Sequence, residues 1–232
     1  MTISSRFDDR PFTAAMAREA GFTRNCLHKL VASGEVRKVL SDVYVATCVK
    51  DSLELRASAA ALVMPDHAVV VDRSAAWLHD VEILDLAELD LVPELDAVSV
   101  GGKEPSRRVG VFGGKRDLSA ADVMTLHPGV KVTIPVRTAC DVACLLGRYR
   151  AIATLDEFRR KHRLSVADLS AQLPRFRGPT RRHPAAGADP PLSTDRADSQ
   201  PESWTRLMIR DAGLPVPEAQ VEVVVPGWGR AR

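Results

Sequence analysis

The amino-acid sequence predicts an α/β protein: a helical module at the start, a mixed α/β region in the middle, and one helix with one strand at the end. Two observations predict this fold class. Within residues 12–34, short runs of helix-forming residues begin at Thr and end at Gly, as two short capped helices do. Beyond residue 50, β-branched runs alternate with helical segments and are separated by Pro and Gly-Gly turns. That alternation predicts a sheet covered by helices.

The composition is that of a soluble globular chain, with 45% hydrophobic and 27% charged residues among 232. This is enough for a sizeable core. The net charge of +2 hides local differences: residues 1–50 carry 8 Lys/Arg and 5 Asp/Glu (+3), residues 51–100 carry 2 and 11 (−9), and residues 101–150 carry 9 and 4 (+5). Basic regions indicate either contact with a phosphate backbone or ordinary solvated surface, and charge alone favours the second.

The sequence shows no signal for export, membrane insertion, metal binding or cofactor binding. The first nine residues hold no apolar stretch, and no run approaches the roughly 18 apolar residues of a membrane-spanning helix. The four cysteines form no CxxC pair, and no nearby His completes a metal-binding set. We therefore expect a cytoplasmic protein with reduced thiols, no metal and no cofactor.

Residues 1–50 are expected to form a winged helix-turn-helix. Thr13 caps a helix that Gly21 ends, and Thr23 caps a second helix, 24–33, that Gly34 ends. Residues 35–46 are rich in β-branched side chains and predict a β-hairpin with its turn at 41–42. The order helix, turn, helix, hairpin is that of a winged DNA-binding module.

The second helix has two distinct faces. Leu27, Leu30 and Val31 form an apolar stripe that should face the core. Polar residues at spacing of four share another face, and Arg, Asn and Lys are side chains that read base edges and bind phosphates. The candidate DNA-binding residues are Thr23, Arg24, Asn25, His28 and Lys29 on the helix, with Arg37 and Lys38 on the wing. The alternative is an ordinary polar helix face.

Residues 51–177 are expected to form the α/β domain. The expected elements are a helix ending at Pro65, a strand at 68–71, a helix at 74–79, strands at 91–92, 97–100, 109–112 and 130–134, and a helix at 139–146. Thr138 is expected to cap the last helix, with Arg137 paired to Asp141 at its start. We interpret this pair, and His79-Asp80, as structural and not as a catalytic dyad.

Three motifs, taken in this order, resemble the AbiEi family of antitoxins. They are LSDVY at 40–44, RSAAWLH at 73–79 and VTIPVRTACDVA at 132–143, so the resemblance covers roughly residues 10–170. The resemblance implies a DNA-binding autorepressor of a type IV toxin–antitoxin, or abortive infection, system. Its genetic partner would be a nucleotidyltransferase-like toxin, and its DNA target its own promoter. Asp42 departs from the Gly that the family usually has at this turn, and aspartate adopts a left-handed conformation less readily.

Residues 148–182 are strongly basic, with 10 Lys/Arg against 3 Asp/Glu. Arg159, Arg160, Lys161 and Arg163 lie at the end of an expected helix, 152–161. Two interpretations stand side by side: cations that complement the helix dipole, or a second phosphate-contacting surface. Residues 178–201 are rich in Pro, Ala, Gly, Ser and Asp and predict a linker.

Residues 201–220, PESWTRLMIRDAGLPVPEAQ, resemble the opening of the very-short-patch-repair-like endonuclease domain. The resemblance assigns Glu202 to the acidic position of that domain's first helix. No lysine follows Glu202, so the Glu-x-Lys pair of such a site is missing. Residues 202–232 are therefore expected to be a truncated, vestigial nuclease segment that docks on the rest of the protein, pairs with another chain, or frays.

Two classes of function follow. The first, which we favour, is an antitoxin-type DNA-binding autorepressor that is not an enzyme. The second is a catalytic or substrate-handling protein with an accessory DNA-binding domain, and a third option is an inactive truncated product. The sequence holds no phosphate-binding loop, nucleophile elbow or complete nuclease set, which weighs against catalysis. It leaves the oligomeric state open.

Overall fold

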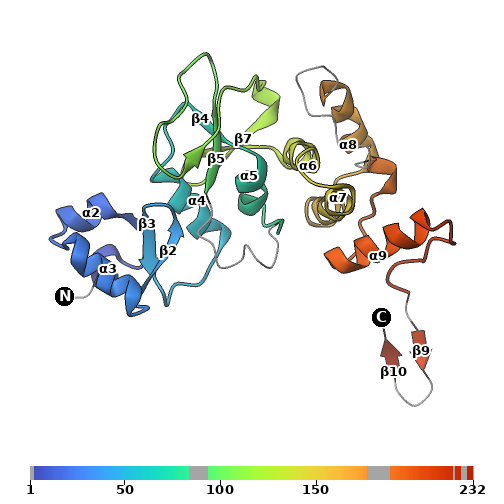
Figure 1. Cartoon of the computed structure of the whole chain (residues 1–232), viewed down its shortest axis with the longest axis horizontal. Helices are drawn as coiled ribbons and strands as arrows, with labels where there is room; N and C mark the ends of the chain where they lie inside the picture. The colour runs from blue at the N-terminus through green and yellow to red at the C-terminus, as the bar shows by residue number, and fades with distance from the viewer. Residues whose placement is uncertain (1–2, 84–93, 177–188, 222, 226–228, 232) are drawn as a thin grey trace. The chain divides into compact units, whose positions relative to one another are not determined.

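The computed structural model describes residues 3–83, 94–176, 189–221, 223–225 and 229–231 (Figure 1). Helices and mixed sheets together confirm the expected α/β class. The chain divides into two compact units: the first comprises Met1–Asp80 with Leu84–Ile134, and the second Val81–Ile83 with Pro135–Arg232. The four segments expected from the sequence (1–50, 51–177, 178–201 and 202–232) stay a prediction about domain organisation.

Residues 3–50, the described part of the first fifty, contain three helices and three strands. These are α1 (Ile3–Phe7), β1 (Phe12–Thr13), α2 (Ala14–Glu19), α3 (Arg24–Ala32), β2 (Val36–Leu40) and β3 (Val43–Ala46). The two expected helices and the hairpin are present in the expected order. The sequence prediction missed α1 and β1, and β1 pairs antiparallel with β3 to give a three-stranded sheet of order β1-β3-β2.

The caps of α2 and α3 are those that the sequence predicts. The Thr13 hydroxyl accepts a hydrogen bond from the Met16 amide at 3.2 Å, and the Thr23 hydroxyl accepts one from the Cys26 amide at 3.2 Å. Each bond satisfies an amide that has no partner within its helix. Gly21, at φ +91°, and Gly34, at φ +75°, follow the two helices in the left-handed conformation that ends them.

The hairpin β2–β3 turns at Ser41-Asp42, and Asp42 has φ +62°. Asp42 therefore adopts the left-handed conformation, which glycine adopts more readily than aspartate. A register irregularity lies between Lys38 and Leu40, and both Val39 and Leu40 are buried. This bulge breaks the strict alternation of the strand, so that two successive apolar side chains are both buried.

In the described residues, the rest of the first unit is a five-stranded sheet with two α-helices and a short 3-10 helix, Ala120–Asp122. Its elements are α4 (Leu53–Ala61), β4 (Ala68–Val70), α5 (Asp72–Leu78), β5 (Leu95–Ser99), β6 (Val111–Phe112), β7 (Val123–Leu126) and β8 (Val130–Thr133). The strand order is β6-β5-β4-β8-β7. β4 pairs parallel with β8, and β5 pairs parallel with β6; the pairs β4–β5 and β7–β8 are antiparallel. The strand expected at 91–92 lies outside the described residues.

One hydrophobic core joins the hairpin to this sheet. It contains Val39, Leu40, Val43 and Val45 of the hairpin together with buried residues of α4, α5, β4, β5 and β8. In Figure 1, α4 lies between the hairpin and the sheet. A second cluster, which includes Val36 of β2, packs the hairpin's first residue against the N-terminal helices. The hairpin is thus held on both sides, because its side chains belong to two cores.

The second unit is helical. Its elements are α6 (Pro135–Ala143), α7 (Arg148–His162), α8 (Val166–Gln172), 3-10 helices at Leu173–Phe176 and Pro190–Leu192, α9 (Gln200–Asp211) and the antiparallel strands β9 (Val223–Val225) and β10 (Gly229–Ala231). α7 is its central helix and packs against α6 and α9. Ile152 and Phe158 of α7 and Leu207 of α9 are fully buried, so α9 docks on the rest of the unit.

Three details of the second unit differ from expectation. α6 begins at Pro135, so Thr138 lies inside the helix, fully buried, and does not cap it; proline is favoured at a first helical position. Of residues 178–201, those at 189–201 are described, and Leu192 and Ala197 among them are buried. The C-terminal segment has two strands where one was expected.

Candidate nucleic-acid interface

The exposed face of α3 carries the residues that the sequence singled out. Arg24, Asn25, His28 and Lys29 are all exposed, and Leu27, four residues before Val31, is buried in the N-terminal core. Leu30 and Val31 pack against the same core. The expected division of the helix into an apolar and a polar face is therefore confirmed. The polar face presents cationic and amide donors to solvent from a helix whose start is fixed by Thr23.

The Tyr44 side chain of β3 is influenced by charges from both the α3 face and the turn. The pKa of Tyr44 is raised by its partial burial and by the Asp42 carboxylate, and the Arg24 guanidinium opposes that shift. The Tyr44 ring also stacks on Phe12 of β1, with centroids 6.0 Å apart. Charges of opposite sign from the start of α3 and from the turn therefore both act on the Tyr44 hydroxyl.

The two cations expected on the wing have different surroundings. The half-buried Arg37 donates a hydrogen bond from Nη2 to the Val49 carbonyl at 3.1 Å. Lys38 is exposed, and its Nζ lies 5.9 Å from the centroid of the Tyr44 ring. Arg37 therefore ties the strand to the following loop, whereas Lys38 offers its ammonium to solvent.

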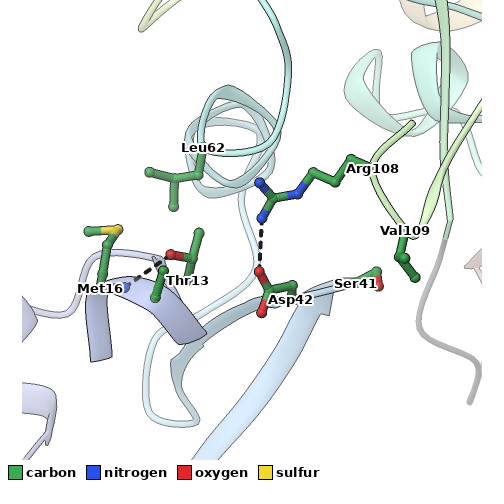
Figure 2. Close-up of a pocket in the computed structure, with 8 residues that line it drawn as sticks. Thr13, Met16, Ser41, Asp42, Leu62, Arg108 and Val109 are labelled. Carbon is green, nitrogen blue, oxygen red and sulfur yellow. Dashed lines mark hydrogen bonds and ion pairs between the residues drawn. The ribbon is translucent and has the colours of Figure 1, made fainter. Parts of the chain in front are cut away.

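An open pocket of about 540 Å³ lies beside the wing turn (Figure 2). Its lining residues come from three parts of the first unit: Thr13, Ala15 and Met16 from the start of α2, Ser41 and Asp42 from the turn, and Leu62, Arg108 and Val109 from the α/β region. Arg108 Nη2 donates to Asp42 Oδ2 at 2.8 Å. The ion pair thus joins the wing turn to a loop more than sixty residues further along the chain.

The second candidate surface, in the second unit, is partly used within the protein. Arg159 donates from Nη1 to the Ser193 carbonyl and from Nε to the Leu164 carbonyl at 3.2 Å, and Lys161 pairs with Glu157 at 3.2 Å. Arg160 and Arg163 are exposed. Arg159 therefore has a structural role, and the two exposed arginines are the ones left for a ligand.

Glu202 belongs to the cap of α9. Its Oε1 accepts from the Ser199 hydroxyl at 3.1 Å, and its Oε2 accepts from the Asp198 amide at 3.2 Å and from Gln220 Nε2 at 2.9 Å. The Ser199 hydroxyl in turn accepts from the Glu202 amide at 3.4 Å. Ser199 and Glu202, three residues apart, are the sequence signal that marks this role.

The other residues considered for chemistry have structural partners. Arg137 and Asp141 form the expected ion pair, 2.8 Å between Nε and Oδ2, and both side chains are buried in α6. His79 is buried, with Nε2 2.7 Å from the Thr133 carbonyl oxygen. The described residues hold no group of three His, Cys, Asp or Glu that could bind a metal ion. Nor does any helix in the described ranges have the length and apolar character to cross a membrane.

Known proteins support the middle of this architecture. Residues 67–185 match the model of the AbiEi antitoxin C-terminal domain. Two proteins of Mycobacterium tuberculosis, the uncharacterized proteins MT2308 (strain CDC 1551 / Oshkosh) and Rv2248 (strain ATCC 25618 / H37Rv), are each 30% identical to the chain over 202 residues. The alignment covers 87% of this chain and 69% of each relative. The matched domain contains two of the three motifs, at 73–79 and 132–143, that carry the resemblance. The chain belongs to the AbiEi antitoxin family.

Proposed function

We propose that this antitoxin binds the DNA upstream of its own gene through α3 and the wing, and represses its own transcription. The observation that supports this most directly is the exposed set Arg24, Asn25, His28 and Lys29 on a capped helix followed by a hairpin. The first residues of a recognition helix meet base edges in the major groove, and the wing meets the backbone. An autorepressor of this kind acts in the cytoplasm.

We propose further that the system is of type IV, with a nucleotidyltransferase-like toxin encoded beside this gene. A toxin partner is supported by the family match, which covers the antitoxin domain at 67–185. Expression of the neighbouring gene alone should arrest growth, and co-expression of this chain should restore it. Restoration by a chain with Arg24→Ala would show that neutralisation does not need full affinity for the upstream DNA.

We infer that Glu202 is a capping residue and that the protein needs no nuclease chemistry for its role. Within the described residues, Glu202 accepts hydrogen bonds from Asp198 and Ser199 near the start of α9 and from Gln220. A nuclease carboxylate must face a metal ion together with other carboxylates. Asp211 lies at the far end of the same helix and pairs with Arg148 at 2.7 Å.

The DNA-binding proposal is tested by a mobility-shift titration over a range of salt concentrations. The probe is a duplex from the region upstream of the gene, and the control is a scrambled duplex of the same length and base composition. We expect tighter binding of the upstream duplex, weakening steeply with salt because bound cations displace counterions. No binding of the upstream duplex even at low salt would end the repressor proposal.

A further inference from the structure

The wing has an unusual feature for a DNA-contacting turn: its tip is short and acidic. The turn is Ser41-Asp42, and the charged side chain that it presents is the Asp42 carboxylate, 41% exposed. A phosphate that approaches this tip would be repelled, because like charges at short range cost free energy. A wing built this way needs a cation from elsewhere to hold a DNA backbone.

The α/β region places a loop directly against this tip. Gly110 packs so closely on the turn that a Cβ added to it would lie 2.1 Å from the Ser41 Cβ. Gly110 also has φ +81°, so its position needs glycine on two counts. The Gly110 carbonyl accepts from the Leu95 amide at 2.9 Å, which ties the loop to β5. The loop and the wing turn therefore keep a fixed relation, since the hairpin and the sheet also share one core.

This loop carries two cations beside the turn, Arg107 and Arg108. Arg108 reaches the wing turn and pairs with Asp42 at 2.8 Å, with the two side chains 37% and 41% exposed. Arg107 is exposed beside it, and Val109 is 85% exposed. Figure 2 shows Arg108 extended from the loop toward Asp42 of the turn, and both residues line the open pocket. Exposed ion pairs are weak and screened by salt, so a phosphate can compete with Asp42 for Arg108.

We propose that Arg107 and Arg108 form a second element of the DNA interface, which contacts the phosphate backbone beside the wing. This rests on the proposed function, because it requires that the wing face DNA. The loop belongs to the domain matched by the family model, outside the helix-turn-helix. The α/β domain thereby adds affinity that is independent of sequence, while α3 supplies the discrimination between sequences.

The experiment measures dissociation constants for the upstream and scrambled duplexes against salt, using the full chain with Arg107→Ala, Arg108→Ala and both changes together. Each lost phosphate contact should weaken binding of both duplexes about five- to tenfold at about 0.1 M salt and lower the salt slope by about 0.9. Lys131→Ala is the control, because Lys131 is an exposed cation on β8 of the same unit and, like Arg108, already has a partner, the Asp66 carbonyl at 2.7 Å from its Nζ. An equal loss with Lys131→Ala would overturn the proposal.

Asp42→Asn separates a phosphate contact from a merely structural ion pair. Asparagine tolerates the left-handed conformation of the turn, so the wing keeps its shape while the carboxylate charge is removed. If Arg108 binds phosphate, Asp42→Asn should tighten binding of both duplexes, and its circular dichroism and melting temperature should match the wild type. If Arg108 serves only to hold the turn, Asp42→Asn should weaken binding as much as Arg108→Ala does, which would refute the proposal.

The binding data distinguish a failure of the Arg107–Arg108 contact from a failure of the repressor proposal on which it rests. If the wild type binds neither duplex, the proposed function fails. If the wild type binds the upstream duplex, and the arginine variants bind it with the same affinity and salt slope, then the repressor proposal stands and the second element of the interface does not exist.

Discussion

Arg206 of α9 and Asp156 of α7 form a buried ion pair in the second unit, 2.8 Å between Nη2 and Oδ2, with side chains 12% and 1% exposed. Burial raises the pKa of Asp156, and hydrogen bonds from Thr194 and the Arg206 cation oppose that shift. Arg206 also donates to the Leu192 carbonyl at 2.7 Å. The pair joins α9 and the segment before it to the central helix.

Removal of one partner of this pair should destabilise the second unit. Arg206→Met leaves the Asp156 carboxylate buried without its cation, which costs about 3–5 kcal/mol in comparable sites. The measurement is urea unfolding followed by tryptophan fluorescence, since Trp204 lies on α9. Arg210→Met, at an exposed position of the same helix, is the control and should change the free energy of unfolding by less than about 0.5 kcal/mol. Similar effects of both changes would contradict this account.

The raised pKa of Asp96 predicts that the stability of the protein depends on pH. Burial and the neighbouring Asp72 carboxylate raise the pKa of Asp96 to about 6, against 3.8 for the free residue. The folded protein therefore holds this proton more tightly, so the stabilisation is complete below about pH 4 and is lost as the pH rises through about 6. Asp96→Asn cannot ionise, so from pH 4 to pH 7 the variant should gain on the order of 2 kcal/mol relative to the wild type.

The check for Asp96 is the free energy of unfolding of both proteins across this pH range. Asp66→Asn, at an exposed position of the same unit, serves as the control for the loss of one carboxylate. Parallel pH profiles of wild type and Asp96→Asn would show that the folded protein does not perturb the Asp96 carboxyl.

Two changes at Glu202 distinguish a cap from a catalytic group. Glutamine keeps an oxygen that can accept the hydrogen bond from the Asp198 amide, so Glu202→Gln should leave the stability almost unchanged, whereas Glu202→Ala should cost about 1 kcal/mol. Incubation with supercoiled plasmid and Mg²⁺ or Mn²⁺ should give no cleavage by any of the three proteins. Cleavage by the wild type that both variants lose would identify Glu202 as a nuclease residue.

The cysteines should differ widely in reactivity. Burial raises the pKa of Cys140 to about 12, with further contributions from Cys144 and Asp141, whereas Cys48 is exposed. Because the thiolate is the reactive form, Cys48 should react first with a maleimide and Cys140 only on unfolding. Mass spectrometry of the partly labelled protein measures the order, and early labelling of Cys140 would mean that α6 opens readily.

The parts of the fold that the sequence predicts best are those that local chemistry determines. Thr13 and Thr23 cap their helices because a hydroxyl three residues before a free amide satisfies it whatever surrounds it. The same holds for Gly21 and Gly34, whose left-handed conformation needs no distant partner. The exposed face of α3 follows from the helical period alone, and so it too was predictable.

The features that the sequence does not reveal depend on contacts between distant segments. β1 has two residues, and its pairing with β3 depends on Phe12 and Thr13 meeting Tyr44 and Val43. The Arg108–Asp42 pair spans residues 66 positions apart, and no local pattern marks it. At Thr138, a capping pattern competes with the preference of proline for the start of a helix, and the helix begins at Pro135, four residues earlier than expected.

The wing and α3 should contribute to DNA binding in different ways. Lys38→Ala removes an exposed ammonium from β2, so it should weaken the upstream and scrambled duplexes alike and flatten the salt slope. Arg37→Ala is less informative, because Arg37 also holds the Val49 carbonyl. A loss on the upstream duplex alone would place Lys38 among the residues that read sequence.

The central claim, that α3 reads the sequence of its own promoter, is tested most directly by one competition measurement. The ratio of affinities for the upstream and scrambled duplexes is measured by fluorescence anisotropy for the wild type, Arg24→Ala and Asn25→Ala. The account predicts that each change costs about 1–3 kcal/mol on the upstream duplex and much less on the scrambled one, so that the ratio falls. Equal losses on the two duplexes, with the ratio unchanged, would contradict it.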